Sequence, residues 1–291
     1  MPRTDRVLVF GDVIDDIIVV PRAPVRRDTD TPSDIRSRPG GSAANTAAWL
    51  ARAGADVSFV GRCAREDVAR HAAALEAAGV RPLLRGDATL PTGTIIVVVE
   101  GDARSMLTER GANAALSPAD VAPGGYDLVH ATGYSLLGHD EAFGEFVDRA
   151  HAEGVRVSLN AGAVAAIDDI GLEAFLAAAA GVDILVATAA EASLLTGERG
   201  PDAAAVTLAR RHGLVAVTAG REGAWVASGD TVERVPSIEV AAIDPTGAGD
   251  AFTAGFLAAT LDGGDPTEAG RRGVALAAEA VSSLGGRPAR A

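Results

Sequence analysis

The sequence predicts an α/β fold with a mostly parallel central sheet and helices on both of its faces. The first observation behind this prediction is that short apolar runs alternate with helical segments in the second half of the chain. The strand-like runs cover 127–131, 155–159, 183–187 and 214–218. The helical segments lie near 140–153, 170–180, 190–195 and 201–212. The second observation is the composition: 48% of the 291 residues are hydrophobic but only 4% are aromatic, which is typical of a globular interior of Ala, Val, Leu and Ile. We therefore expect one large domain spanning 1–291.

The N-terminal part of the chain continues this alternation. The apolar run 7–10 is closed by Gly11-Asp12 and resumes at 17–20, which predicts a strand, a bend and a second strand. Small and apolar residues over 42–53 predict a helix that ends at Gly54, after which a new strand begins.

A small second sheet is predicted beside the main one. A β-branched run at 94–100, a Gly-containing turn and an extended run at 104–108 have the pattern of a hairpin. Because no helix separates these strands, we expect them to leave the main sheet and to form a lid, built from parts of about 12–38 and 94–110. The segment 21–39 is rich in Pro, Arg and Asp, and we expect a mobile loop there.

The charge and the cysteine content exclude several classes of protein. The formal net charge of -13 disfavours a nucleic-acid partner, because binding to a phosphate backbone depends on clustered basic residues. The single cysteine, Cys63, excludes an internal disulfide framework. The first residues lack the apolar stretch of a signal peptide, and no run reaches the ~18 apolar residues of a membrane span. We expect a cytoplasmic enzyme without a membrane partner.

All 26 basic residues are arginines, since the sequence contains no lysine. A Walker A loop, a protein-kinase site and a Schiff-base enzyme each require a lysine. The sequence excludes all three classes.

The segment Asp244–Asp250 (DPTGAGD) carries the strongest chemical signal. It is a glycine-rich turn that leads into a predicted helix over 251–261. The first N–H groups of a helix have no intrahelical partners and lie at the positive end of its dipole, so such a turn can bind a phosphate without lysine. The segment does not fit the dinucleotide-binding pattern, because Phe252 stands where a third glycine is required.

Asp250 stands in the first turn of that helix, beside the predicted phosphate site. A carboxylate there could act as the general base of a phosphoryl transfer. It could equally be a helix cap, which is a common role of Asp at such positions. The local pattern leaves both interpretations open.

Two motifs resemble the signatures of the ribokinase-like PfkB carbohydrate kinases. Asp244–Asp250 followed by Ala254-Gly255 is similar to the C-terminal signature of this family, and Pro39–Ala47 is similar to its N-terminal signature, a Gly-Gly pair followed by an asparagine. The resemblance extends over essentially the whole chain. It implies a three-layer α/β/α ribokinase-like fold with a small β-sheet lid, in which sugar and ATP meet at the carboxyl edge of the central sheet.

The same resemblance implies roles for individual residues. Asp250 would take the proton of a sugar hydroxyl, and the backbone N–H groups of Gly247, Ala248 and Gly249 would form an anion hole. The residues that would bind the sugar are Asp16, Gly40, Gly41 and Asn45.

The nucleotide side is also implied by the resemblance. Thr218, Gly220 and Gly223 would contact the phosphates of ATP, and Glu191 would help to hold Mg²⁺ through water. Thr188 replaces the asparagine that the family commonly has three positions before that glutamate. The resemblance also implies a possible monovalent cation site (K⁺) beside Asp244 and a possible homodimer formed through the lid.

The sequence therefore predicts an ATP-dependent kinase for a small sugar or sugar acid. A nucleoside kinase of the same fold is one alternative, although Tyr134 is the only aromatic residue that we expect near the site for stacking a base. A catalytically silent sugar-binding regulatory protein is a second alternative, and a nucleotide-binding oxidoreductase is a third. The sequence does not identify the substrate.

Overall fold

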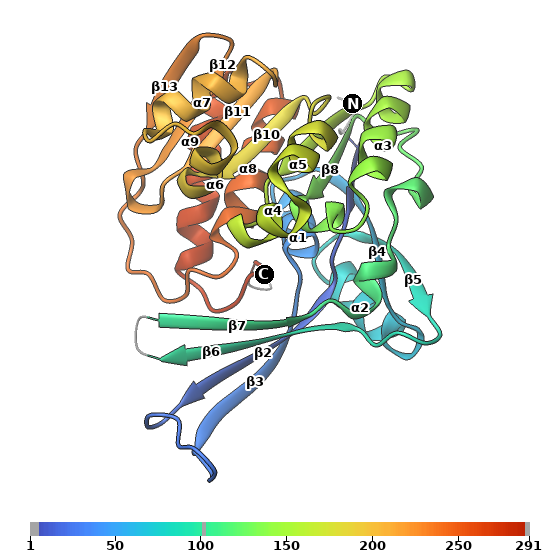
Figure 1. Cartoon of the computed structure of the whole chain (residues 1–291), viewed down its shortest axis with the longest axis vertical. Helices are drawn as coiled ribbons and strands as arrows, with labels where there is room; N and C mark the ends of the chain where they lie inside the picture. The colour runs from blue at the N-terminus through green and yellow to red at the C-terminus, as the bar shows by residue number, and fades with distance from the viewer. Residues whose placement is uncertain (1–5, 101–102, 289–291) are drawn as a thin grey trace.

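A nine-stranded sheet runs through the centre of the protein in the computed structural model, which describes residues 6–100 and 103–288 (Figure 1). Its strand order is β13-β12-β11-β10-β9-β8-β1-β4-β5. The strands are β1 (Arg6–Phe10), β4 (Asp56–Ala64), β5 (Arg81–Asp87), β8 (Leu128–Thr132), β9 (Arg156–Asn160), β10 (Ile184–Thr188), β11 (Leu214–Thr218), β12 (Ala224–Ser228) and β13 (Thr231–Val235). The seven strands from β5 to β11 in this order are parallel to one another, whereas β12 is antiparallel to β11 and β13 is antiparallel to β12.

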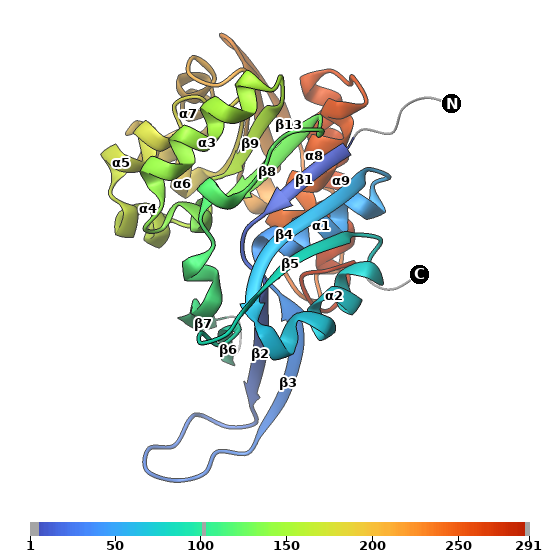
Figure 2. The same cartoon turned by 90° about the vertical axis from the view of Figure 1, so that its right-hand side faces the viewer.

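Helices cover both faces of this sheet (Figure 2). One face packs against α3 (Asp140–Ala152), α4 (Val164–Ile170), α5 (Leu172–Ala178), α6 (Ala189–Thr196) and α7 (Pro201–Ala209). The other face packs against α1 (Ser42–Arg52), α2 (Val68–Glu76), α8 (Ala248–Leu261) and α9 (Pro266–Val281). The protein therefore has three layers.

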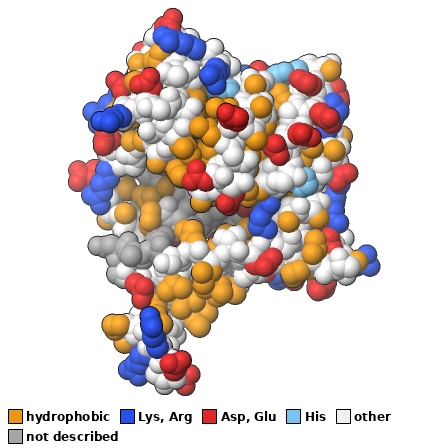
Figure 3. All heavy atoms as spheres, in the orientation of Figure 1, with side chains coloured by type: hydrophobic (Ala, Val, Ile, Leu, Met, Phe, Trp, Pro, Cys, Tyr) orange, Lys and Arg blue, Asp and Glu red, His pale blue; other side chains and the backbone are white. Residues whose placement is uncertain are grey.

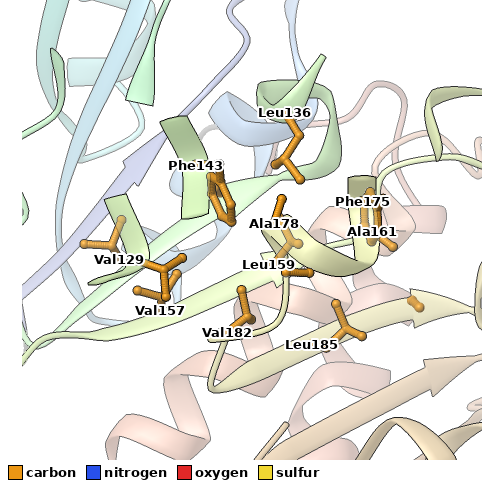
Figure 4. Close-up of a cluster of buried hydrophobic side chains, with 14 of the residues drawn as sticks. Val129, Leu136, Phe143, Val157, Leu159, Ala161, Phe175, Ala178, Val182 and Leu185 are labelled. Carbon is orange, nitrogen blue, oxygen red and sulfur yellow. The ribbon is translucent and has the colours of Figure 1, made fainter. Parts of the chain in front are cut away.

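The two cores follow from the alternation of side chains along each strand. In β1, Leu8 and Phe10 belong to one buried cluster, whereas Val7 and Val9 belong to the other. Figure 4 shows part of the first cluster, in which Phe143 lies near Val129 and Val157, and Phe175 lies beside Ala161. Because both faces are covered, the strands consist of nearly continuous apolar runs.

The second sheet has four strands in the order β3-β2-β6-β7 and projects below the main body (Figure 1). Its strands are β2 (Ile14–Pro21), β3 (Ser33–Gly40), β6 (Gly93–Glu100) and β7 (Ala103–Glu109). Side chains alternate between its faces, so Asp16 lies on one face, and Ile35 and Leu107 lie on the other. We call this four-stranded sheet the lid.

The predicted fold class is confirmed: a mostly parallel sheet lies between two helical layers, with a smaller sheet beside it. One local prediction was wrong. Residues 33–39, part of the segment 21–39 in which we expected a mobile loop, belong to β3, which pairs with β2 along its whole length. The charged residues of this segment lack the apolar pattern that predicts a strand. Charged side chains are nevertheless common on edge strands, and β3 lies at the edge of the lid.

The helix predicted near 170–180 is α5, and an additional helix that was not predicted, α4, ends directly before it at Gly171. Within residues 6–100 and 103–288, no helix has the length and apolar character needed to span a membrane.

Candidate active site

The glycine-rich turn before α8 places Asp250 in the first turn of that helix. Gly247 begins the helix in the left-handed conformation (φ 77°), and a Cβ atom there would lie 2.5 Å from Gly286. Both constraints require glycine at position 247. In the described part of the chain, the N–H groups of Gly247 and Gly249 have no hydrogen-bond partner, whereas Ala248 N–H donates to the carbonyl of Pro245 at 3.3 Å. The turn thus presents free N–H groups beside a carboxylate.

The Asp250 carboxylate is held by α1 and not by its own helix. Ser42 Oγ donates to Oδ1 at 2.7 Å, and Asn45 Nδ2 donates to Oδ2 at 3.0 Å. The protein atoms around the carboxyl displace most of its hydration, which raises the pKa of Asp250 to about 7; the carboxylates of Asp12 and Asp16 add to this effect. The side chain still keeps some contact with solvent. A helix cap would accept from the N–H groups of α8, whereas this carboxylate accepts from side chains of α1.

Asp12 orients the start of α1, and the sequence analysis did not identify it. Its carboxylate accepts from Ser42 N–H at 2.8 Å and from Ala43 N–H at 3.4 Å. Its side chain is only 8% exposed, and burial raises its pKa. Its position directly after β1 and Gly11, at the carboxyl end of a central strand, was the available signal.

Asp16 and Gly40 lie together on neighbouring strands of the lid. A Cβ atom at Gly40 would overlap the Asp16 carboxylate, so the glycine leaves room for this side chain. Loss of hydration raises the pKa of Asp16 to about 6; Asp12 also raises it, while Arg287 lowers it. The carboxylate accepts no hydrogen bond within residues 6–100 and 103–288. Asp16 is therefore available to a ligand.

A second residue that the sequence analysis missed is Arg287, in the segment that follows α9. Its Nη2 donates to the carbonyl of Gly40 at 3.0 Å, and its Nε donates to Oδ1 of Asn45 at 3.4 Å. Asn45, which is only 4% exposed, thus links Arg287 to Asp250. The pair Gly285-Gly286, where backbone approaches Asp244 and Trp49, was the only local sign of this site.

The residues predicted for the nucleotide lie at the carboxyl ends of β10 and β11. Thr218 ends β11 opposite Thr188, which ends β10. A short helical turn at Gly220–Glu222 follows, and Gly223 (φ 95°) approaches the carbonyl of Val235.

Glu191 and Thr188 bind each other in the first turn of α6. Thr188 Oγ1 accepts from Glu191 N–H at 3.3 Å, and Glu191 Oε2 accepts from Thr188 N–H at 2.8 Å, which makes a capping box. Glu191 is 5% exposed, and no group of three metal-ligating side chains occurs in the described residues. This arrangement is suited to binding Mg²⁺ through water molecules and not to direct coordination by several side chains.

Tyr134 lies near several carboxylates of the site. Burial raises the pKa of its hydroxyl, and the carboxylates of Asp12, Asp250 and Glu191 contribute to this shift. Glu191 and Asp250 therefore both lie within electrostatic range of the Tyr134 hydroxyl.

Asp244 ties the turn to the segment after α9. Its Oδ1 accepts from Thr246 N–H and its Oδ2 from Gly285 N–H, each at 3.0 Å. The side chain is 6% exposed. These two hydrogen bonds hold the turn in the conformation that leaves the N–H groups of Gly247 and Gly249 free.

The turn before α8 can stabilise a transferring phosphoryl group through its backbone, and the carboxylate beside it can accept the proton of an alcohol. These two abilities define a small-molecule kinase. The family described as pfkB family carbohydrate kinase matches residues 4–290. The chain belongs to this family, and it is an ATP-dependent carbohydrate kinase.

Similar proteins include several named kinases. The ribokinase of Bacillus subtilis (strain 168) is 28% identical over 98% of this chain and 96% of its own length. The ATP-dependent ribose-1-phosphate kinase of Halopiger xanaduensis is 33% identical over 89% of this chain and 86% of its own length. The crystal structure of adenosine kinase from Sinorhizobium meliloti has a TM-score of 0.85 and 28% identity, with 98% of this chain and 96% of that chain covered.

Proposed function

We propose that the protein uses ATP to phosphorylate a hydroxyl group of a small sugar or sugar acid, with Asp250 as the general base. The environment of the Asp250 carboxylate supports this proposal most directly. It stands beside free N–H groups of the turn, and its pKa of about 7 is close to neutral pH. A general base is most effective when its pKa lies near the working pH.

The proposed step is a direct transfer. The oxygen of the acceptor hydroxyl attacks the γ-phosphorus of ATP, the bond from that phosphorus to the bridging oxygen breaks, and ADP leaves with the bonding electron pair. The proton of the hydroxyl passes to Asp250. The free N–H groups of Gly247 and Gly249, together with that of Ala248, whose hydrogen bond to Pro245 is long at 3.3 Å, stabilise the charge on the transferring group.

The acceptor and the nucleotide approach from two sides. Asp16, Gly40 and Gly41 hold the acceptor, and Asn45 contributes by positioning Asp250, since its amide is already bonded to that carboxylate and to Arg287. On the other side, Thr218, Gly220 and Gly223 contact the phosphates of ATP.

Mg²⁺ enters as part of the MgATP substrate, and Glu191 would hold it through water. A monovalent cation such as K⁺ beside Asp244 is part of the same proposal. Comparing turnover in potassium and tetramethylammonium salts tests it, and equal rates would contradict it.

A nucleoside kinase is the second candidate, and the similarity to the adenosine kinase of Sinorhizobium meliloti favours it. The decisive experiment is a screen for ADP release with MgATP and a panel of pentoses, hexoses, sugar acids and nucleosides. Turnover of a sugar or a sugar acid would support the proposal, and turnover of nucleosides alone would favour the second candidate. Binding of a sugar without any ADP release would instead indicate a silent sugar-binding protein.

The lid provides a surface for a second copy of the chain. The face opposite Asp16 carries Ile17, Val19 and Ile96, and on the same face Ile35 is 64% exposed and Leu107 is 61% exposed. Figure 3 shows hydrophobic side chains gathered on the lid. Because an exposed apolar sheet face is stabilised when another protein surface packs against it, we propose a homodimer that forms through this face of the lid.

A further inference from the structure

A pocket of about 560 Å³ lies between the lid and the main body, next to the candidate active site. It is lined by β2 and β3, by the C-terminal ends of α1 and α2, and by the segment 284–288 that follows α9. Asp16 and Arg287 both line it. The pocket is large enough for a small ligand, and its lining includes Asp16, one of the residues expected to bind the acceptor.

The charged groups of this pocket are mostly positive, although the whole chain carries a net charge of -13. The lining groups are Asp16, Arg38, Arg52 and Arg287. Arg52 forms an ion pair with Glu279, which offsets its charge. Arg38 donates to the carbonyl of Leu284 at 2.8 Å and has no carboxylate partner among the described residues.

Arg287 lacks an ionic partner in the same way. Its two hydrogen bonds go to the uncharged oxygens of Gly40 and Asn45, and its Nη1 is buried without any hydrogen-bond partner within residues 6–100 and 103–288. A buried donor without a partner is costly, so such groups commonly mark the position of a missing ligand atom. The two unpaired arginines and the single Asp16 leave the pocket with one positive charge that nothing in its lining neutralises.

Asp16 complements these donors. Its carboxylate can accept hydrogen bonds from two hydroxyl groups, whereas Arg38 and Arg287 can only donate. A ligand that satisfies the pocket therefore has hydroxyl groups at one place and a negatively charged acceptor group at another.

We propose that the acceptor substrate carries one anionic group, which binds between Arg38 and Arg287 while its hydroxyl groups bind Asp16, and that Arg287 sets the preference for such acceptors. This inference rests on the proposed kinase function and names its substrate class. Arg287 is separated from Asp250 only by the amide group of Asn45, so a small acceptor held at Arg287 lies close to the base. The anionic group is a carboxylate or a phosphate monoester.

The test compares acceptors that differ in this group. Neutral sugars, the corresponding sugar acids and the corresponding sugar monophosphates are assayed for ADP release with MgATP. The wild-type protein should show at least a tenfold higher kcat/KM for a sugar acid or a sugar monophosphate than for its neutral counterpart. Comparison of these two arms identifies the carboxylate or the phosphate as the recognised group.

Four variants test the residues. Arg287→Gln should raise the KM for the best anionic acceptor by about 10- to 100-fold, the usual loss for a hydrogen bond to a charged group, with kcat within threefold and the KM for ATP unchanged. Arg38→Gln should raise the same KM by a smaller factor. Arg287→Lys keeps the charge and should restore part of the preference. Arg36→Gln changes an exposed arginine of the same strand that does not line the pocket, and it should leave the KM unchanged.

Other results would overturn the inference. A neutral sugar or a nucleoside with a kcat/KM at or above that of every anionic acceptor would show that the pocket does not select charge. Equal losses for neutral and anionic acceptors in Arg287→Gln, with no rescue by lysine, would assign Arg287 a structural role only. No ADP release with any acceptor would refute the kinase proposal itself, which is a different result from turnover without preference for anions.

Discussion

Replacement of Asp250 by asparagine should separate catalysis from stability. Asparagine keeps the shape of the side chain, and it can retain both contacts: its oxygen accepts from Asn45 Nδ2, and its amide donates to Ser42 Oγ. It cannot accept a proton. Because a general base typically contributes 10²–10⁴ in rate, we expect kcat to fall by about 100- to 10,000-fold with little change in the affinity for ATP.

The same substitution should stabilise the protein at alkaline pH. The pKa of Asp250 is about 7 in the folded protein and 3.8 for an ordinary aspartate. A raised carboxyl pKa means that the folded state holds its proton more tightly than the unfolded state, so the stability of the wild type falls as pH rises from about 4 to about 7. At about 1.4 kcal/mol per unit the full penalty would approach about 4 kcal/mol. Because the side chain retains some solvent, we expect about 1–2 kcal/mol.

Thermal unfolding of both proteins between pH 4 and pH 8 measures this penalty. The melting temperature of Asp250→Asn relative to wild type should rise across this range, by roughly 2–5 °C in total. A gain in melting temperature that does not depend on pH would show that the folded protein does not disfavour the ionised form of Asp250. Turnover of the variant within tenfold of wild type would show that Asp250 is not the base.

Three other substitutions test neighbouring features. Ser42→Ala removes the 2.7 Å hydrogen bond to Asp250 and should raise the pKa of that carboxyl further, so the acid limb of the kcat/KM profile should move up by about 0.5–1 pH unit; an unmoved limb would contradict the role of the serine. Gly247→Ala places a side chain against Gly286 in a left-handed position and should destabilise the fold by about 1–3 kcal/mol in chemical denaturation. The control is Gly249→Ala, which meets no neighbour and should melt like wild type. Leu107→Glu should convert the expected dimer to a monomer in light scattering at micromolar concentration, and a monomeric wild type would contradict the lid interface.

Most of the fold could be predicted from the sequence because the central strands are buried on both faces. Their uninterrupted apolar runs, such as 184–187, need no tertiary information to be found. The edge strand β3 could not be predicted in the same way, because its sequence SDIRSRPG is charged and its strand conformation depends on pairing with β2.

The site was predictable to the extent that it lies in local motifs. The glycines of the turn before α8 and the Gly40-Gly41 pair both indicate places where backbone comes close to another group. The two motifs meet in the structure, where Asn45 of α1 contacts Asp250 of α8. Arg287 also follows a Gly-Gly pair, Gly285-Gly286, but that pair does not indicate what the arginine contacts. Its importance comes from where the chain folds back after α9, and nothing in a local window shows that an arginine there lies against Gly40.

The contact between Arg287 and Gly40 joins residues that are 247 positions apart. During synthesis, the first half of the chain can form β1, β2 and α1 long before this arginine leaves the ribosome. Until the segment after α9 has docked, the carbonyl of Gly40 and the amide of Asn45 lack Arg287 and are hydrated by water. The proposed acceptor pocket is therefore complete only after the segment 284–288 has been synthesised and has docked against the lid.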